Sequence, residues 1–106
     1  MINMSQQQFD KAVMDENLPV LIDFWAPWCV YCRRIAPAME KIAQQYEGRV
    51  LVAQVNIDDE PALAARERIE VIPTLVLYQG GQVLDSIVAP ESKARIEEFI
   101  ESNLNV

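Results

Sequence analysis

The sequence predicts an α/β domain in which a central mixed β-sheet has helices on both faces. Helical and strand-like segments alternate, a long amphipathic segment separates two apolar runs, and a Gly-Gly pair joins two further strand-like runs. Apolar strands connected through a helix pair in parallel by a right-handed crossover, whereas a short glycine turn joins antiparallel strands. We therefore expect a mixed sheet in one domain, residues 1–106.

The N-terminal part is predicted to form a helix followed by a buried strand. Ser5 and Gln8 have the spacing of a capping box, which marks a helix start. Phe9 and two further apolar residues then lie on one side of this helix. Residues 19–25 are mostly apolar and have the length of a buried strand. A minor strand at the N-terminus is compatible with this pattern.

The longest helix is expected from Cys29 to about Glu47, where Gly48 provides a natural end. Its apolar residues recur at the spacing of one helical face: Ile35, Met39, Ile42 and Tyr46. Pro37 lies inside this segment and is expected to kink the helix, because proline removes a backbone hydrogen bond. The kink would let the helix begin at the cysteines and still pack on the sheet.

The second half is predicted to contain a strand, a short helix, a hairpin and a final helix. Residues 50–57 are largely β-branched and aliphatic, as in a buried strand. Residues 58–61 place three acids and a proline at the start of a short helix. Strands at residues 74–78 and 82–88 flank the Gly-Gly pair, and Ser92 opens the last helix.

Composition and charge argue against two classes of function, nucleic-acid binding and membrane insertion. The net charge is −7, whereas a nucleic-acid partner would require clustered lysine and arginine. No run of about 20 apolar residues is present, so we expect no membrane span. The chain begins with Met and has no basic and apolar leader. We therefore expect a cytoplasmic protein that binds neither nucleic acid nor membrane.

The most informative motif is Cys29-x-x-Cys32, which follows the strand at residues 19–25 and opens the long helix. These are the only 2 cysteines, and the chain has no histidine. One molecule therefore cannot supply four sulfur or imidazole ligands to zinc, and we expect no metal site. Residues three apart on a helix have Cβ atoms about 5–6 Å apart, which a small adjustment brings to disulfide distance.

At a helix start, unpaired backbone N–H groups and the helix dipole favour a thiolate over a thiol. Cys29 is therefore expected to be the nucleophile and Cys32 the resolving thiol. Cys29 would attack a partner disulfide to form a mixed disulfide, which Cys32 would break to release the reduced partner. An inert pair of thiols or a static disulfide is the alternative that the motif alone leaves open.

Four segments together resemble the thioredoxin family, and the resemblance extends over nearly the whole chain. They are VLIDFWAPWC at 20–29, IAP at 35–37, VNID at 55–58 and IPTL at 72–75. The resemblance implies the thioredoxin fold and a thiol–disulfide oxidoreductase that reduces protein disulfides. It also implies disulfide-containing protein substrates and a thioredoxin-reductase-type electron donor. We expect a monomer with no bound cofactor, only the redox-active Cys29–Cys32 disulfide.

Asp23 interrupts the apolar strand at residues 19–25, where burial would raise the pKa of a carboxyl. Strand alternation places it on one face with Leu21 and Trp25, which leaves open whether it is buried or faces water. A hydrogen-bonded structural aspartate is another interpretation. The resemblance implies that Asp23 lies beneath the resolving cysteine and accepts its proton.

Pro73 stands directly before a predicted strand, where proline is ordinary because few X–Pro bonds are cis. The resemblance implies instead that Ile72-Pro73 is a cis bond across from the cysteines and presents backbone to the substrate chain. From the sequence alone, Trp25 and Trp28 are equally compatible with aromatic residues of the hydrophobic core. The resemblance implies that Trp28 covers the cysteine pair and shapes its rim.

The chain departs from the usual thioredoxin between its cysteines, where Val30-Tyr31 replaces Gly-Pro. Removing the proline restores a backbone N–H that can donate to the Cys29 sulfur. This donation would stabilise the thiolate and hence the reduced form. We therefore predict a more oxidising couple than in a typical thioredoxin.

Other departures surround the expected site. Gln54 stands where the family has a lysine near the buried aspartate, and loss of that cation should raise the Asp23 pKa further. Gln54 can still accept a hydrogen bond from a protonated carboxyl. Val71 and Ala89 replace glycines of the family's docking surface. Bulkier residues there predict a narrower or different set of protein partners.

Three alternatives to a disulfide reductase stay open. A more oxidising couple would suit a disulfide isomerase or oxidant. A binding or scaffold module would use the cysteines rarely, and its Cys29 would alkylate slowly near neutral pH. A dimer could share four cysteines around zinc or an iron–sulfur cluster.

Overall fold

The computed structural model describes residues 1–15 and 17–104 and shows a five-stranded sheet with strand order β1-β3-β2-β4-β5. The strands are β1 (Ile2–Asn3), β2 (Val20–Trp25), β3 (Leu51–Asn56), β4 (Thr74–Gln79) and β5 (Gln82–Val88). The helices are α1 (Gln6–Met14), α2 (Val30–Gln45), α3 (Pro61–Arg66) and α4 (Lys93–Asn103). This order confirms the predicted fold class and includes the minor N-terminal strand.

The sheet is mixed, as predicted. β3 lies between β1 and β2 and is parallel to both, so the connection through α2 is a parallel crossover. β4 pairs antiparallel with β2, and β5 returns antiparallel to β4. The turn between them uses Gly80 and Gly81 at φ values of +59° and +80°, which residues with a Cβ rarely adopt. β2 thus occupies the middle of the sheet.

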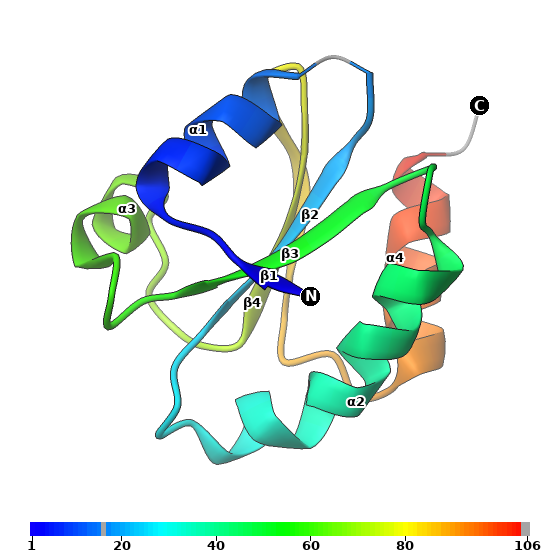
Figure 1. Ribbon diagram of the computed structural model, residues 1–106. Coiled ribbons are helices and arrows are strands. Elements are labelled where there is room, and N and C mark those ends of the chain that lie inside the picture. Colours follow the sequence, from blue (N-terminus) through cyan, green and yellow to red (C-terminus); the bar gives the residue numbers. More distant parts are fainter. Residues whose placement is uncertain (16, 105–106) are drawn as a thin grey trace.

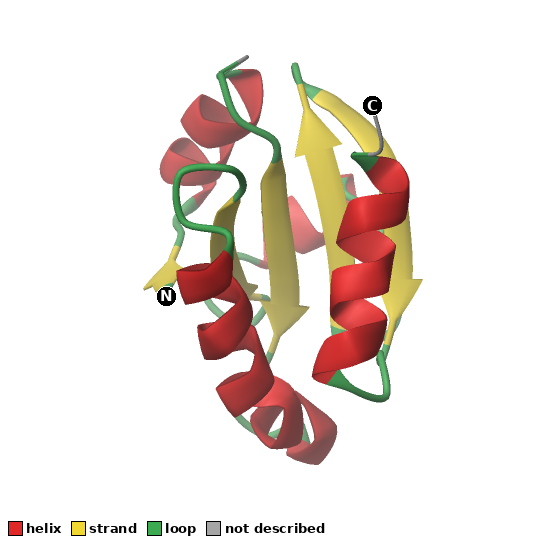
Figure 2. Cartoon of the chain, turned by 90° about the vertical axis from the view of Figure 1, so that its right-hand side faces the viewer, coloured by secondary structure: helices red, strands yellow, loops and turns green. Residues whose placement is uncertain are grey.

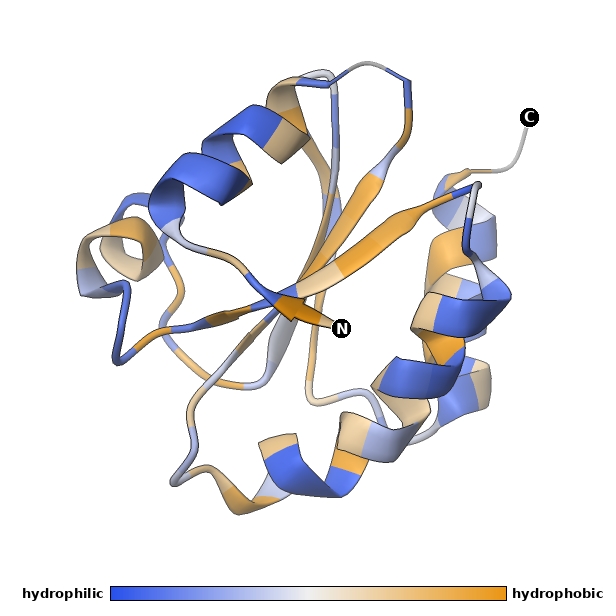
Figure 3. Ribbon diagram, in the orientation of Figure 1, coloured by the Kyte–Doolittle hydropathy of each residue, from blue (hydrophilic) through white to orange (hydrophobic). Residues whose placement is uncertain are grey.

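The helices cover the two faces of the sheet in pairs. α2 and α4 lie on one face, and α1 and α3 lie on the other (Figure 1 and Figure 2). Alternate residues of β2 enter the two cores: Leu21 packs in the core that includes α2 and α4, and Ile22 in the core that includes α1 and α3. Figure 3 shows the hydrophobic colour concentrated on the central strands. The first five residues of β2, 20–24, are therefore buried whichever face they point to.

The longest helix begins as predicted but ends earlier. Cys29 is its N-cap, and the helix runs to Gln45, two residues before the expected end at Glu47. Tyr46 is the C-cap, and residues 46–49 form a turn in which Gly48 has φ +85°. The helix ends before the glycine, and the turn closes where the Arg49 and Val50 amides bond back to the Tyr46 carbonyl. Pro37 lies inside the helix, and α2 changes direction along its length in Figure 1.

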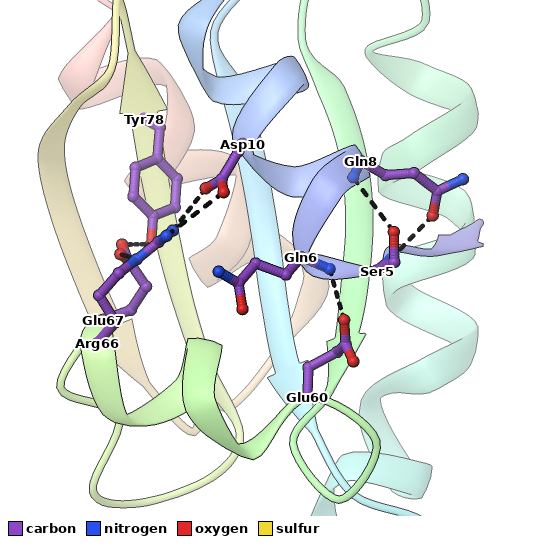
Figure 4. A network of polar contacts seen from close by, with 8 residues as sticks. All are labelled: Ser5, Gln6, Gln8, Asp10, Glu60, Arg66, Glu67 and Tyr78. Atoms are coloured by element: carbon purple, nitrogen blue, oxygen red, sulfur yellow. Dashed lines mark hydrogen bonds and ion pairs between the residues drawn. The ribbon is translucent and has the colours of Figure 1, made fainter.

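The start of α1 has the predicted capping box. The Ser5 hydroxyl accepts from the Gln8 N–H at 3.2 Å, and the Gln8 side chain accepts from the Ser5 N–H at 2.9 Å (Figure 4). Glu60 is the N-cap of α3 but makes no side-chain cap bond to its own helix. Its carboxylate accepts from the Gln6 N–H instead. One of the acids expected to cap α3 therefore supports the start of α1.

An ion-pair network that the sequence did not indicate joins α1, α3 and β4. The Arg66 guanidinium lies 2.6 Å from the Asp10 carboxylate and 3.1 Å from that of Glu67. The Tyr78 hydroxyl donates to Glu67 at 2.7 Å, as Figure 4 shows. This network fixes two helices on the face opposite α2. No helix among the described residues combines the length and apolar character needed to cross a membrane.

Candidate active site

The cysteine pair lies where the chain leaves the central strand β2 and enters α2. Cys29 is the N-cap residue of α2, and Cys32 lies in its first turn. The two cysteines form a disulfide, with their Cα atoms 5.3 Å apart. Cys29 is 8% exposed and Cys32 is 3% exposed. The motif therefore forms a redox-capable pair at a helix start, as its spacing and position predicted.

The sulfur of Cys29 takes the place of an ordinary N-cap oxygen. Cys29 Sγ accepts a hydrogen bond from the Cys32 N–H at 3.1 Å. The sequence predicted that the donor would be the N–H that residue 31 regains without proline. In the disulfide form the donor is Cys32, whose N–H a Gly-Pro motif would also possess. The hydrogen bond seen in the disulfide form therefore does not come from Tyr31, whose N–H was expected to donate to Cys29 Sγ.

Asp23 is buried in β2 on the face covered by α2. It is 2% exposed, on the same side of the strand as Leu21, so the interpretation that it faces water is wrong. Asp23 Oδ1 has no hydrogen-bond partner among the described residues. Gln54 is its neighbour in the register of β3 but does not satisfy that oxygen. Burial raises the pKa of the Asp23 carboxyl from 3.8 to about 7.

The Ile72-Pro73 bond is cis and faces the cysteines. The Ile72 carbonyl oxygen lies 3.9 Å from Cys29 Sγ, and Pro73 is buried. The Thr74 hydroxyl donates to the Val71 carbonyl at 2.6 Å, which joins the residues on either side of the cis bond. The loop therefore presents a backbone carbonyl beside the sulfur that is expected to react.

Exposed apolar side chains stand around Cys29. Trp28 is 64% exposed, Val30 is 60% exposed and Val71 is 53% exposed. The Trp28 indole N–H donates to Asp58 Oδ2 at 3.0 Å, so the ring belongs to the rim and not to a core. Trp25 is half-buried in β2, and its indole bonds to Asn3. We call Trp28, Val30 and Val71 the apolar rim.

A disulfide at a helix start, beside a cis-proline carbonyl and with a buried carboxyl in the preceding strand, agrees with the comparisons with known proteins. The family model for Thioredoxin matches residues 1–102. The chain belongs to the thioredoxin family. It is 45% identical to Thioredoxin 1 of Nostoc sp. over 96 residues, which cover 91% of this chain and 90% of the relative. Thioredoxin of Synechocystis sp. is 44% identical over 100 residues, covering 94% of each chain.

A more distant relative leads to the same family. Thioredoxin of Haemophilus influenzae is 34% identical over 103 residues, which cover 97% of this chain and 96% of the relative. Together with the Cys29–Cys32 disulfide, these relatives identify the chain as a thiol–disulfide oxidoreductase that acts on protein disulfides. The family also implies protein substrates and a reductase partner.

Within this thioredoxin-family site, two contacts escaped the sequence analysis. Asp58 was expected only as an acid before α3, yet it holds the Trp28 indole. The Tyr31 hydroxyl donates to the Pro90 carbonyl at 2.9 Å, next to Ala89 with φ +45°. Both contacts join residues far apart in the chain, and no local pattern in the sequence indicates them.

Metal binding has no candidate in the described part of this thioredoxin-family chain. Residues 1–15 and 17–104 contain no group of three or more histidine, cysteine, aspartate or glutamate side chains that could hold a metal ion.

Proposed function

We propose that this protein reduces disulfides in protein substrates through a dithiol–disulfide cycle of Cys29 and Cys32. The supporting observation is the Cys29 sulfur at the N-cap of α2, where it accepts the Cys32 N–H. A helix start favours the thiolate, which is the nucleophilic form. In the reduced protein, the Cys29 thiolate attacks one sulfur of the substrate disulfide. A new S–S bond forms, and the other substrate sulfur leaves as a thiolate that takes up a proton.

Cys32 completes the cycle. Its thiol loses a proton and attacks Cys29 Sγ, which forms the Cys29–Cys32 disulfide and releases the second substrate sulfur. Two electrons have then passed from the protein to the substrate. We assign the Cys32 proton to Asp23, whose buried carboxyl has a pKa raised to about 7. A base with a pKa near the working pH is effective because it is ionised yet still holds a proton well.

The apolar rim and the Ile72 carbonyl support polypeptide substrates over small ones. Apolar side chains that surround a reactive sulfur give a docked chain surface to bury, and a backbone carbonyl can accept a hydrogen bond from its main chain. Electrons would return from a thioredoxin-reductase-type donor. The cytoplasm suits this role, since thiols are kept reduced there.

Trapping the mixed disulfide tests the assigned roles. Cys32→Ser should accumulate a covalent adduct with a disulfide-containing protein such as insulin, because the resolving thiol is absent. Cys29→Ser should accumulate none. Intact-protein mass spectrometry measures both. Adducts in Cys29→Ser alone would reverse the roles, and no reduction of insulin by the unmodified protein would refute the function.

A disulfide isomerase or oxidant is the second candidate. The observation that favours it is Val30-Tyr31 between the cysteines, which places a backbone N–H where the usual thioredoxin has proline. Equilibration with defined glutathione buffers, followed by trapping of the cysteines, gives the reduction potential. A value near that of general thioredoxins supports the reductase, and a value well above it supports the isomerase or oxidant.

A further inference from the structure

The side chain of Tyr31 reaches from the cysteine motif to a distant loop. Its hydroxyl donates to the Pro90 carbonyl at 2.9 Å across a separation of 59 residues. The half-buried ring packs against the core that includes α2 and α4, and the Arg34 guanidinium lies 6.0 Å from the ring centroid. Packing therefore holds the ring, and the hydroxyl adds one directional bond to the loop between β5 and α4.

The loop that Tyr31 contacts is joined in turn to the loop that faces Cys29. The Ala89 N–H donates to the Pro73 carbonyl at 2.9 Å. The neighbouring Ile72 carbonyl lies 3.9 Å from Cys29 Sγ. These contacts form a closed ring that leads from the start of α2 through two loops and back to the sulfur. The position of the β5–α4 loop therefore affects the groups that surround Cys29.

The β5–α4 loop contains an uncommon backbone conformation that contacts with neighbouring segments must stabilise. Ala89 has φ +45°, a left-handed conformation that a residue with a Cβ rarely adopts. The loop also lines a shallow cavity of about 290 Å³ together with the end of β5, where Val88 is 53% exposed. Two hydrogen bonds join this loop to its neighbours: the Pro90 carbonyl accepts from Tyr31 of the cysteine motif, and the Ala89 N–H donates to Pro73 of the cis-proline loop.

We propose that Tyr31 is a positioning residue that holds the β5–α4 loop for a docked polypeptide substrate. This inference rests on the proposed reduction of protein disulfides. A polypeptide joined to Cys29 lies against Ile72 and the adjoining loops, whereas a small aromatic disulfide reaches the sulfur without them. The Tyr31 hydroxyl therefore raises efficiency on polypeptide disulfides relative to small ones, and it leaves the thiol chemistry of the cysteines unchanged.

The test is Tyr31→Phe, which removes the hydroxyl but keeps the ring against the core and Arg34. Tyr46→Phe is the matched control, because it removes a hydroxyl that is bonded to Glu101 of α4 and lies at the opposite end of α2 from the cysteines. Each variant is assayed on insulin and on 5,5′-dithiobis(2-nitrobenzoic acid), a small aromatic disulfide. Loss of one hydrogen bond predicts that kcat/KM of Tyr31→Phe on insulin falls about two- to tenfold, mainly through KM. Its rate with the small disulfide and its equilibrium with glutathione should match the unmodified protein.

A second measurement does not depend on turnover. Hydrogen exchange of the Ala89 amide should accelerate in Tyr31→Phe and stay unchanged in Tyr46→Phe. Unchanged exchange and unchanged insulin kinetics would overturn the inference, as would an equal loss on both substrates. If the unmodified protein reduces no insulin, the proposed function fails. In that case the Ala89 exchange rate still decides whether Tyr31 holds the loop.

Discussion

Asp23 is a carboxyl buried in the central strand, and its Oδ1 finds no hydrogen-bond partner within residues 1–15 and 17–104. Burying an unpaired charge is costly, so the group retains its proton to an unusually high pH, with a pKa of about 7. An apolar residue at this position would give a more stable sheet. The presence of Asp23 is better explained by a chemical role than by packing, because a buried oxygen without a hydrogen bond does not stabilise the core.

The pKa of Asp23 predicts how stability depends on pH. Between 3.8 and about 7 the folded protein keeps the proton and the unfolded chain has lost it. The free energy of unfolding therefore decreases as pH rises through this window, by a total of about 4 kcal/mol at most. Asp23→Asn removes this contribution. Urea unfolding from pH 4 to pH 8 should show the variant gaining stability relative to the unmodified protein, and a pH-independent difference would contradict the raised pKa.

The same substitution should slow only the second step of the cycle. With no base beneath the helix, attack of Cys32 on the mixed disulfide should slow on the order of 100-fold near neutral pH. Rapid-mixing measurement of mixed-disulfide decay gives this rate. Alkylation of Cys29 in the reduced protein serves as the control and should be unchanged. Equal slowing of both reactions would show that Asp23→Asn disturbs Cys29 as well.

At the scale of elements, the first turn of α2 sets the chemistry of the sulfur. In the disulfide form Cys32 donates to Cys29 Sγ. In the reduced form, we expect the N–H of Tyr31 to serve the thiolate as a second donor, and proline at this position would remove it. We therefore expect Val30-Tyr31 to differ from a Gly-Pro motif in the stability of the reduced form and not of the disulfide.

Replacing Val30-Tyr31 by Gly-Pro tests this interpretation. The variant should be a weaker oxidant, with its glutathione equilibrium shifted about tenfold toward the disulfide, or roughly 30 mV. Val30→Gly is the matched control, because it changes the side chain but keeps the N–H at residue 31. Equilibration in glutathione buffers measures both. If Val30→Gly alone shifted the glutathione equilibrium by the full tenfold, the effect would come from the side chain at residue 30 and not from the N–H at residue 31.

Local signals predicted the elements well because each is encoded within a few residues. The capping box at Ser5 and the cysteine N-cap of α2 both occur where the sequence placed them. The Arg66 network with Asp10 could not be predicted, since it joins residues 56 apart that only the packing of α1 on α3 brings together. The same holds for the Tyr31 bond to Pro90.

At the scale of the whole molecule, the surface around Cys29 is assembled from three separate segments. The start of α2 supplies Trp28 and Val30, the cis-proline loop supplies Val71, and the β5–α4 loop supplies Ala89. Comparison with the thioredoxin pattern singled out all four residues, Trp28 as a match and the other three as departures, but their exposure and mutual placement required the structure. The buried position of Asp23 likewise required the structure, because strand alternation allowed either face.

Val71 is the residue of the apolar rim whose size should restrict partners most directly, since it adjoins the Ile72 carbonyl beside Cys29. Val71→Gly removes a side chain that is 53% exposed and opens space for a docked chain. With a general thioredoxin reductase as donor, the variant should reduce insulin severalfold faster. It should lose about 0.5–1 kcal/mol of stability, because glycine is more flexible in the unfolded chain.

The matched control is Val83→Gly, since Val83 is 58% exposed but lies at the hairpin end of β5, opposite Tyr78. This variant should lose stability, as glycine weakens a strand, and leave insulin reduction unchanged. Faster reduction by Val71→Gly alone would show that the rim limits access of protein substrates to Cys29. Equal rates for Val71→Gly and the unmodified protein would refute the restriction, and a rate already equal to that of an ordinary thioredoxin would refute specialisation altogether.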